Sequence, residues 1–185
     1  MDRLLAEHAP WVAPDSAVRD ARAAGLATTV TIAVAFGCPF TGEVDPRRIS
    51  DIVARLTDQA APDEIALADT IGVGVPAQVR DLAARTAERA PGIPQRWHFH
   101  NTRNTGYANA LTALDSGAGA IDASVGGFGG CPFAPAATGN IASEDLVYAL
   151  DRSEVITGVD MQGLIAAAAW LGRALDKNVP ALLGR

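Results

Sequence analysis

The chain has 185 residues, of which 49% are hydrophobic and 19% charged, a composition typical of one globular domain with a substantial core. Its formal net charge of -6 argues against nucleic acid or an anionic membrane surface as the main partner. No signal peptide or membrane-spanning stretch stands out, and two cysteines, Cys38 and Cys131, form no disulfide framework. We therefore expect a cytoplasmic protein with reduced thiols and no membrane partner.

Helical and extended patterns alternate along the chain after a first helix over Asp15–Ala24. The predicted strands cover Thr28–Phe36, Glu64–Asp69, Arg96–His100 and Ala120–Val125. One predicted helix begins at Asp45-Pro46, and the others cover Pro76–Arg89, Gly106–Ser116, Ser143–Leu150 and Asp160–Leu175. Strands that alternate with helices are parallel and joined by right-handed crossovers, so the pattern predicts an α/β fold. We expect one domain over residues 1–185, with no element assigned to residues 1–14.

Local signals support these elements. Residues Thr28–Phe36 are β-branched and then almost uniformly apolar, as in a buried parallel strand. Asp45-Pro46 supplies an N-cap followed by proline at the first helical position. Ser143 is expected to cap a later helix, in which Glu144 and Asp145 interact favourably with the helix dipole.

Polar and thiol side chains recur where the predicted strands end. Cys38 follows the first strand, Asp69 ends the second, His98 and His100 end the third, and Cys131 follows the fourth. In a parallel α/β fold the carboxyl ends of the strands form the rim at which ligands bind, whether the sheet is open or closed. The sequence therefore predicts a functional site at this rim, with Cys38 as a structural residue.

His98 and His100 are two residues apart on a strand, so both rings point to the same face. Two converging imidazoles are a natural metal chelate, although an isolated pair with this spacing more often only forms hydrogen bonds at a rim. Asn140, at the end of the neighbouring glycine-rich loop, offers an oxygen ligand and favours the metal interpretation. Mixed nitrogen and oxygen ligation suits Mn²⁺ or Mg²⁺.

Two other rim residues have ordinary alternatives. Asp69 precedes a glycine-containing turn, which it could simply form; near two histidines it could instead orient a ligand or share a proton. Cys131 lies on a glycine-rich loop, Gly126–Gly130, whose backbone can approach a ligand closely. This thiol either reaches a bound substrate or belongs to a connector with one buried cysteine.

Four motifs together resemble a known family. They are GCPF with TGEVDP over Gly37–Pro46, LADTIGVGVP over Leu67–Pro76, HFHNT over His98–Thr102, and GGFGGCPFAPAATGN with SEDLVY over Gly126–Tyr148. This combination resembles hydroxymethylglutaryl-CoA lyase and its close bacterial relatives, which belong to the metal-dependent lyase and synthase barrels. The resemblance runs from about Gly25 to Leu175, and Cys131 separates the lyase branch from the synthases.

The resemblance implies a TIM-type parallel (β/α) barrel and an acyl-CoA substrate. It implies that His98, His100 and Asn140 bind Mg²⁺ or Mn²⁺ and that Cys131 is the catalytic thiol. It also implies that Asp69 supports acid–base chemistry near the metal, and His98 counts among the catalytic residues as well as the ligands. The expected reaction is retro-Claisen cleavage of a 3-hydroxyacyl-CoA to acetyl-CoA and a 3-oxoacid. Asn101 stands where the classical lyases have aspartate, which leaves the acyl group open.

A (β/α)₈ barrel has eight strands, whereas four β/α units and a closing helix account for this chain. We therefore expect about half of a barrel, the C-terminal portion, which exposes an apolar edge and half of the barrel interior. A homo-oligomer or association with an N-terminal half is the expected partner arrangement. Two alternatives to the lyase remain: a catalytically silent half-barrel that serves in folding or interaction, and an aldol-type acyl-CoA synthase of the same superfamily.

Overall fold

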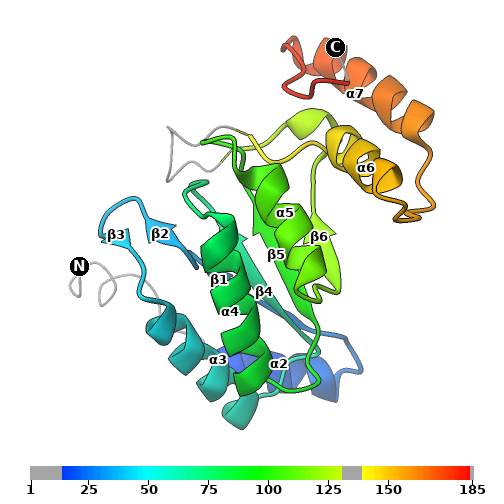
Figure 1. Ribbon diagram of the computed structural model, residues 1–185. Helices are drawn as coiled ribbons and strands as arrows, with labels where there is room; N and C mark the ends of the chain where they lie inside the picture. The colour runs from blue at the N-terminus through cyan, green and yellow to red at the C-terminus, as the bar shows by residue number, and fades with distance from the viewer. Residues whose placement is uncertain (1–13, 131–138, 184–185) are drawn as a thin grey trace.

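The computed structural model describes residues 14–130 and 139–183 (Figure 1). Helix α2 (Pro14–Ala23) and strand β1 (Thr29–Ala33) are followed by a small antiparallel hairpin, β2 (Gly37–Cys38) and β3 (Gly42–Glu43). The chain then alternates through α3 (Pro46–Gln59), β4 (Glu64–Asp69), α4 (Pro76–Arg89), β5 (Gln95–Phe99), α5 (Gly106–Asp115) and β6 (Ala120–Asp122). It closes with the 3₁₀ turn η1 (Val125–Gly127), α6 (Ser143–Arg152) and α7 (Met161–Leu175).

The four longer strands form one parallel sheet in the order β1-β4-β5-β6. Helices α3, α4 and α5 lie along one face of this sheet, and α6 and α7 pack together beyond the end at which β5 and β6 finish (Figure 1). Four successive β/α units with a closing helix are half of a TIM-type barrel, as the sequence predicts. Within the described ranges, no helix has both the length and the apolarity needed to cross a bilayer.

The hydrophobic core lies between the sheet and these three helices. Its centre is an aromatic cluster of Phe36, Trp97 and Phe99, whose ring centroids are 5.8 to 6.3 Å apart. Trp97 and Phe99 alternate with His98 along β5, so the strand buries its aromatic side chains on the helix side. The same alternation turns His98 toward the opposite face.

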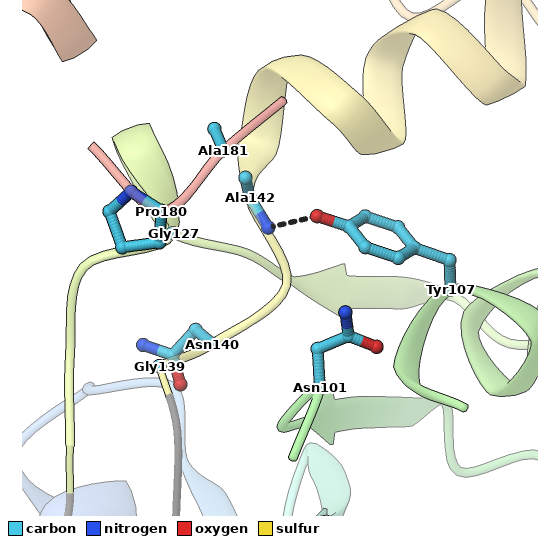
Figure 2. A pocket seen from close by; sticks show the side chains of 8 residues that line it. All are labelled: Asn101, Tyr107, Gly127, Gly139, Asn140, Ala142, Pro180 and Ala181. Atoms are coloured by element: carbon cyan, nitrogen blue, oxygen red, sulfur yellow. Dashed lines mark hydrogen bonds between the residues drawn. The ribbon is translucent and has the colours of Figure 1, made fainter. Parts of the chain in front are cut away.

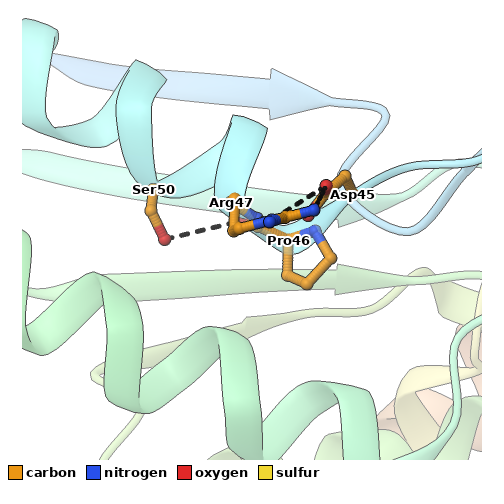
Figure 3. A network of polar contacts seen from close by, with 4 residues as sticks. All are labelled: Asp45, Pro46, Arg47 and Ser50. Carbon is orange, nitrogen blue, oxygen red and sulfur yellow. Dashed lines mark hydrogen bonds and ion pairs between the residues drawn. The ribbon is translucent and has the colours of Figure 1, made fainter.

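Helix α3 begins where the sequence predicts. The Asp45 carboxylate accepts a hydrogen bond from the Arg47 backbone N–H at 2.9 Å, and Pro46 occupies the first turn (Figure 3). The Ser50 hydroxyl donates to the Pro46 carbonyl at 3.2 Å, a side-chain bond to a helical carbonyl one turn earlier. This junction orients α3 so that Ile49 and Val53 are buried against the sheet.

Three predicted boundaries are wrong. The strand predicted over Thr28–Phe36 ends at Ala33, because the chain bends there and buries the Phe36 side chain in the core. The strand predicted over Ala120–Val125 ends at Asp122, and the 3₁₀ turn η1, in which Gly126 and Gly127 adopt φ values of 72° and 70°, takes up its predicted end at Val125. Ser143 is the first helical residue of α6 rather than its cap, and Ala142 is the N-cap without a side-chain bond.

The uncovered face of the sheet, the exposed half of a barrel interior, carries polar side chains. One hydrogen-bonded row crosses all four strands: the Thr29 hydroxyl donates to Glu64 at 2.8 Å, and the Arg96 guanidinium donates to Glu64 at 2.7 Å and to Asp122 at 2.8 Å. Thr31 is also exposed on this face, whereas Ile32 beside it is buried. Charge pairing therefore runs through the region that is the interior of a closed barrel.

Candidate functional site

The carboxyl ends of β4 and β5 bring the predicted rim residues together. Ala68 of β4 is in register with His98 of β5, and Asp69 is in register with Phe99. Asp69 ends β4, and His100 directly follows β5. The predicted grouping of Asp69, His98 and His100 on neighbouring strand ends is therefore present in the structure.

Asp69 forms the turn that follows its strand. Its buried carboxylate accepts hydrogen bonds from the backbone N–H groups of Val73 at 2.9 Å and Gly74 at 2.8 Å. Burial raises the pKa of the Asp69 carboxyl, while these two N–H groups and His100 act in the opposite direction. The turn-forming role is thus visible in the structure, and the catalytic role of Asp69 stays a prediction.

Helix α5 fixes the other side of this turn. The Thr105 hydroxyl and the Asn109 side-chain amide both donate to the Gly74 carbonyl, at 2.9 and 2.8 Å. A Cβ atom at Gly74 would lie 2.9 Å from the Phe36 ring and 3.0 Å from an Asp69 carboxylate oxygen. Glycine is required here because the turn is packed between the core and the carboxylate that caps it.

The two histidine rings lie close together at the end of β5. The ring centroids of His98 and His100 are 5.1 Å apart, with an edge-on angle of 68°. Desolvation and the neighbouring His100 lower the pKa of His98, whereas Asp122, whose carboxylate lies 3.7 Å from Nδ1 of His98, acts in the opposite direction. A lowered pKa keeps the His98 imidazole neutral near pH 7, the form that binds metals.

Asn140 lies beside His100 because the backbone of the two residues pairs in an antiparallel bridge. The Ile141 N–H donates to the Phe99 carbonyl at 3.2 Å, which continues this pairing. The Asn140 side-chain nitrogen donates to the Phe128 carbonyl at 3.2 Å, and its amide oxygen is buried without a hydrogen-bond partner. A buried carbonyl oxygen normally finds a donor, so this oxygen is free to accept a further bond, as a cation ligand would.

These donors fit a hard divalent cation. Two imidazoles and one amide oxygen are the nitrogen and oxygen ligands that Mg²⁺ and Mn²⁺ accept. The described part of the chain holds no group of three or more His, Cys, Asp and Glu side chains that could bind a metal, and the predicted set accordingly includes an amide. The metal assignment of His98, His100 and Asn140 remains a prediction that the geometry accommodates.

Of the two cysteines, Cys38 lies within the described residues and Cys131 does not. Cys131 lies outside the described residues, which end at Gly130 and resume at Gly139, so its predicted role stays a prediction. Cys38 lies partly exposed in the β2–β3 hairpin. A hydrogen bond with the Thr41 side chain lowers the pKa of the Cys38 thiol.

Three residues near Asn140 have contacts that the sequence patterns do not reveal. Glu144 is fully buried, and both its carboxylate oxygens accept from the Gly126 N–H, at 3.1 and 3.0 Å. The Asp145 carboxylate accepts from the backbone N–H groups of Leu182 and Leu183, at 2.8 and 2.9 Å. Tyr107 of α5 bonds to both Asp145 and Ala142. Glu144 and Asp145, which the sequence predicts to interact with the helix dipole, therefore also bind the backbone of Gly126 and of residues 182–183.

A cavity of about 190 Å³ opens beside Asn140 (Figure 2). Residues from four parts of the chain line it: Asn101, Tyr107, Gly127, Gly139, Asn140, Ala142, Pro180 and Ala181. Figure 2 shows Tyr107 reaching across one side of this cavity to the Ala142 backbone nitrogen. The C-terminal segment therefore forms a wall of the same cavity that Asn140 and the glycine-rich loop border.

Comparison with known proteins gives similar relatives for most of the chain. It is 50% identical over 161 residues to (R)-citramalyl-CoA lyase of Chloroflexus aurantiacus, and 38% identical over 161 residues to hydroxymethylglutaryl-CoA lyase YngG of Bacillus subtilis. Both alignments cover 87% of this chain, with 50% and 54% of the respective relative. The crystal structure of hydroxymethylglutaryl-CoA lyase from Pseudomonas aeruginosa superposes with a TM-score of 0.84 at 36% identity, over 92% of this chain and 56% of that one.

The chain thus spans about half the length of the curated relatives it matches. These relatives are named as lyases of CoA thioesters, in agreement with the resemblance found in the sequence motifs. The HMGL-like family model matches residues 12–171, which is most of the chain. On this match, the chain belongs to the HMGL-like family.

Proposed function

We propose that this chain carries the metal-binding part of a divalent-metal-dependent carbon–carbon lyase that cleaves a 3-hydroxyacyl-CoA. The observation that carries the proposal is the Asn140 amide oxygen, buried without a hydrogen-bond partner on a residue whose backbone pairs with His100 of the His98–His100 pair. Membership of the HMGL-like family supports the same activity. A bound Mg²⁺ or Mn²⁺ would act as a Lewis acid on the substrate's hydroxyl and carbonyl oxygens.

The chain's own residues then take these roles. Asp69, buried at the rim and with its pKa raised by desolvation, accepts the proton of the substrate's 3-hydroxyl group. The hydroxyl oxygen becomes the carbonyl of the oxoacid as the bond between C2 and C3 breaks. The electron pair of that bond passes to the thioester enolate, and the Cys131 thiol donates a proton to C2, which releases acetyl-CoA.

The substrate class follows from the relatives' similarity. The chain is more similar to the Chloroflexus (R)-citramalyl-CoA lyase, at 50% identity, than to the Bacillus hydroxymethylglutaryl-CoA lyase, at 38%. We therefore propose a short branched 3-hydroxyacyl-CoA with a terminal carboxylate as substrate. Asn101, whose side-chain oxygen accepts from the Gly106 N–H at 3.1 Å, lies beside Asn140 at the cavity.

The partner proposed for this chain is a second set of β/α units, either a second copy or an N-terminal half. The open sheet supports it, since helices α3, α4 and α5 leave uncovered the face that carries the row of Glu64, Arg96 and Asp122. Strands β1 and β6 each pair on one side only within the described sheet. Sedimentation of the purified chain tests this: a stable monomer with a cooperative melt would contradict it.

The activity is tested in the full gene product with Mn²⁺ present. (R)-citramalyl-CoA and hydroxymethylglutaryl-CoA are each supplied, and acetyl-CoA is followed by mass spectrometry. We expect cleavage that Cys131→Ala reduces by at least a hundredfold, whereas Cys38→Ala, a change in the partly exposed hairpin, leaves it unchanged. CoA release that requires an added oxoacid would indicate the synthase instead, and absence of cleavage in the unmodified protein would refute the lyase.

A further inference from the structure

The backbone of Asn140 is held on its C-terminal side by a side chain from α5. The Ala142 N–H, buried at 1% exposure, donates to the Tyr107 hydroxyl at 2.9 Å. Ala142 is the N-cap residue of α6 and forms no side-chain cap, so a distant phenol takes the place of a local cap. Because Ala142 lies two residues after Asn140, this bond holds the extended segment, bridged to His100 and to Ser124, that carries the Asn140 amide.

The same hydroxyl group is connected to the C-terminal segment through Asp145. Tyr107 donates to an Asp145 carboxylate oxygen at 3.1 Å, and that oxygen also accepts from the Leu182 N–H at 2.8 Å. The Ala181 N–H donates to the Gly126 carbonyl at 3.0 Å, so the segment is also attached to the glycine-rich loop. One phenol therefore links α5, the start of α6 and the wall of the cavity beside Asn140 (Figure 2).

The other contacts of the Asn140 segment do not replace this bond. Ile141 pairs with the end of β5, and the Ser143 N–H donates to the Ser124 carbonyl at 2.8 Å. Both contacts hold neighbouring residues, and neither satisfies the Ala142 N–H. Without the phenol oxygen, a buried N–H would be left unpaired next to the predicted ligand, and the segment would relax to find another acceptor.

We propose that Tyr107 is a positioning residue for Asn140. Its hydroxyl holds the backbone that orients the Asn140 amide oxygen toward the cation, and it links this orientation to residues 180–183. The inference rests on the proposed function, in which Asn140 is a metal ligand. Its geometry is independent of that function, because each bond joins described residues.

The phenol is suited to this double role over the physiological pH range. Burial raises the pKa of Tyr107 to about 12, with Asp145 acting in the same direction. The hydroxyl thus keeps its proton for Asp145 while its oxygen accepts from Ala142. Phenylalanine would keep the ring in place and remove both bonds, which makes Tyr107→Phe the informative change.

The test compares the 185-residue chain with Tyr107→Phe, and with Tyr148→Phe as the matched control, because Tyr148 is an exposed tyrosine of α6. Amide hydrogen exchange and the side-chain amide signal of Asn140 are recorded by NMR. In Tyr107→Phe we expect exchange at Ala142 to be about tenfold faster and the Asn140 signal to shift. Faster exchange at Ala142 with an unmoved Asn140 signal would overturn the proposal, because Tyr107 would then be only structural.

A calorimetric Mn²⁺ titration separates this inference from the proposed function. If the parent chain binds Mn²⁺, we expect Tyr107→Phe to bind it about tenfold more weakly and Tyr148→Phe to bind it equally well. Equal affinity in all three proteins would overturn the positioning role. If the parent chain does not bind Mn²⁺, the proposed metal site fails, and the NMR comparison alone decides whether Tyr107 sets Asn140.

Discussion

His100 and Asn140 pair backbone to backbone in an antiparallel bridge, although a helix, a strand and the glycine-rich loop separate them in the chain. Because β5 ends at Phe99, the histidine and the asparagine meet at the carboxyl end of the sheet. The position of Asn140 is therefore tied to the residue that directly follows β5, two positions after His98.

Gly74→Ala is expected to destabilise the protein by about 1–3 kcal/mol, the usual cost of overpacking. The added methyl group would lie 2.9 Å from the Phe36 ring and 3.0 Å from an Asp69 oxygen. Urea unfolding measures the change. Gly119→Ala is the control, because the nearest atom to a Cβ there lies at 3.5 Å. If the two variants are equally stable, the turn accommodates the added methyl group, which would contradict the close packing around Gly74.

Arg96→Met is expected to destabilise the folded state by about 1–3 kcal/mol, because it leaves Glu64 and Asp122 without their charged donor. The exposed Arg89 at the end of α4 provides the control, Arg89→Met. Thermal unfolding distinguishes them. If Arg96→Met is as stable as Arg89→Met, the polar row contributes nothing to the fold.

The same variant changes the pH dependence of stability. The hydrogen bond from Arg96 lowers the pKa of Glu64 below its unfolded value. The ionised carboxylate therefore stabilises the fold above its unfolded pKa of about 4.3, and this contribution is lost as the pH falls through the lower folded pKa. We expect the loss of stability as the pH falls below about 4.3 to be shallower in Arg96→Met. Parallel pH profiles would contradict this assignment.

Glu144→Gln is expected to cost about 1–3 kcal/mol, since the amide keeps one acceptor oxygen and turns an N–H toward the Gly126 N–H. Glu88→Gln, on the exposed side of α4, supplies the matched control. Hydrogen exchange at Gly126 should accelerate in Glu144→Gln alone. An unchanged rate there would show that another acceptor serves Gly126.

Local sequence signals predicted most of the fold. The Asp45-Pro46 start of α3, the six-residue strand β4 and the helix Pro76–Arg89 depend on capping, β-branching and helical spacing, all of which act over a few residues. The errors occur where a tertiary contact outweighs the local propensity of the residue. Phe36 has strand propensity, yet the aromatic cluster draws its side chain into the core beyond the end of β1.

The candidate site was predictable only in part. Asp69, His98 and His100 stand at strand ends, a position that periodicity reveals. Tyr107 and Asp145 were not found, because their partners, Ala142 and Leu182, lie far away along the chain and are backbone groups without a residue signature. The acidic residues after Ser143 suggested a helix start and gave no sign of the segment they hold.

The central claim is most directly tested by a calorimetric Mn²⁺ titration of the metal-free chain beside His100→Ala and Asn140→Ala. The exposed amide of Gln162 on α7 supplies the control, Gln162→Ala. We predict that the parent and Gln162→Ala bind Mn²⁺ with equal affinity, and that each of the other variants binds at least tenfold more weakly. Binding of equal strength in all four proteins would contradict the account.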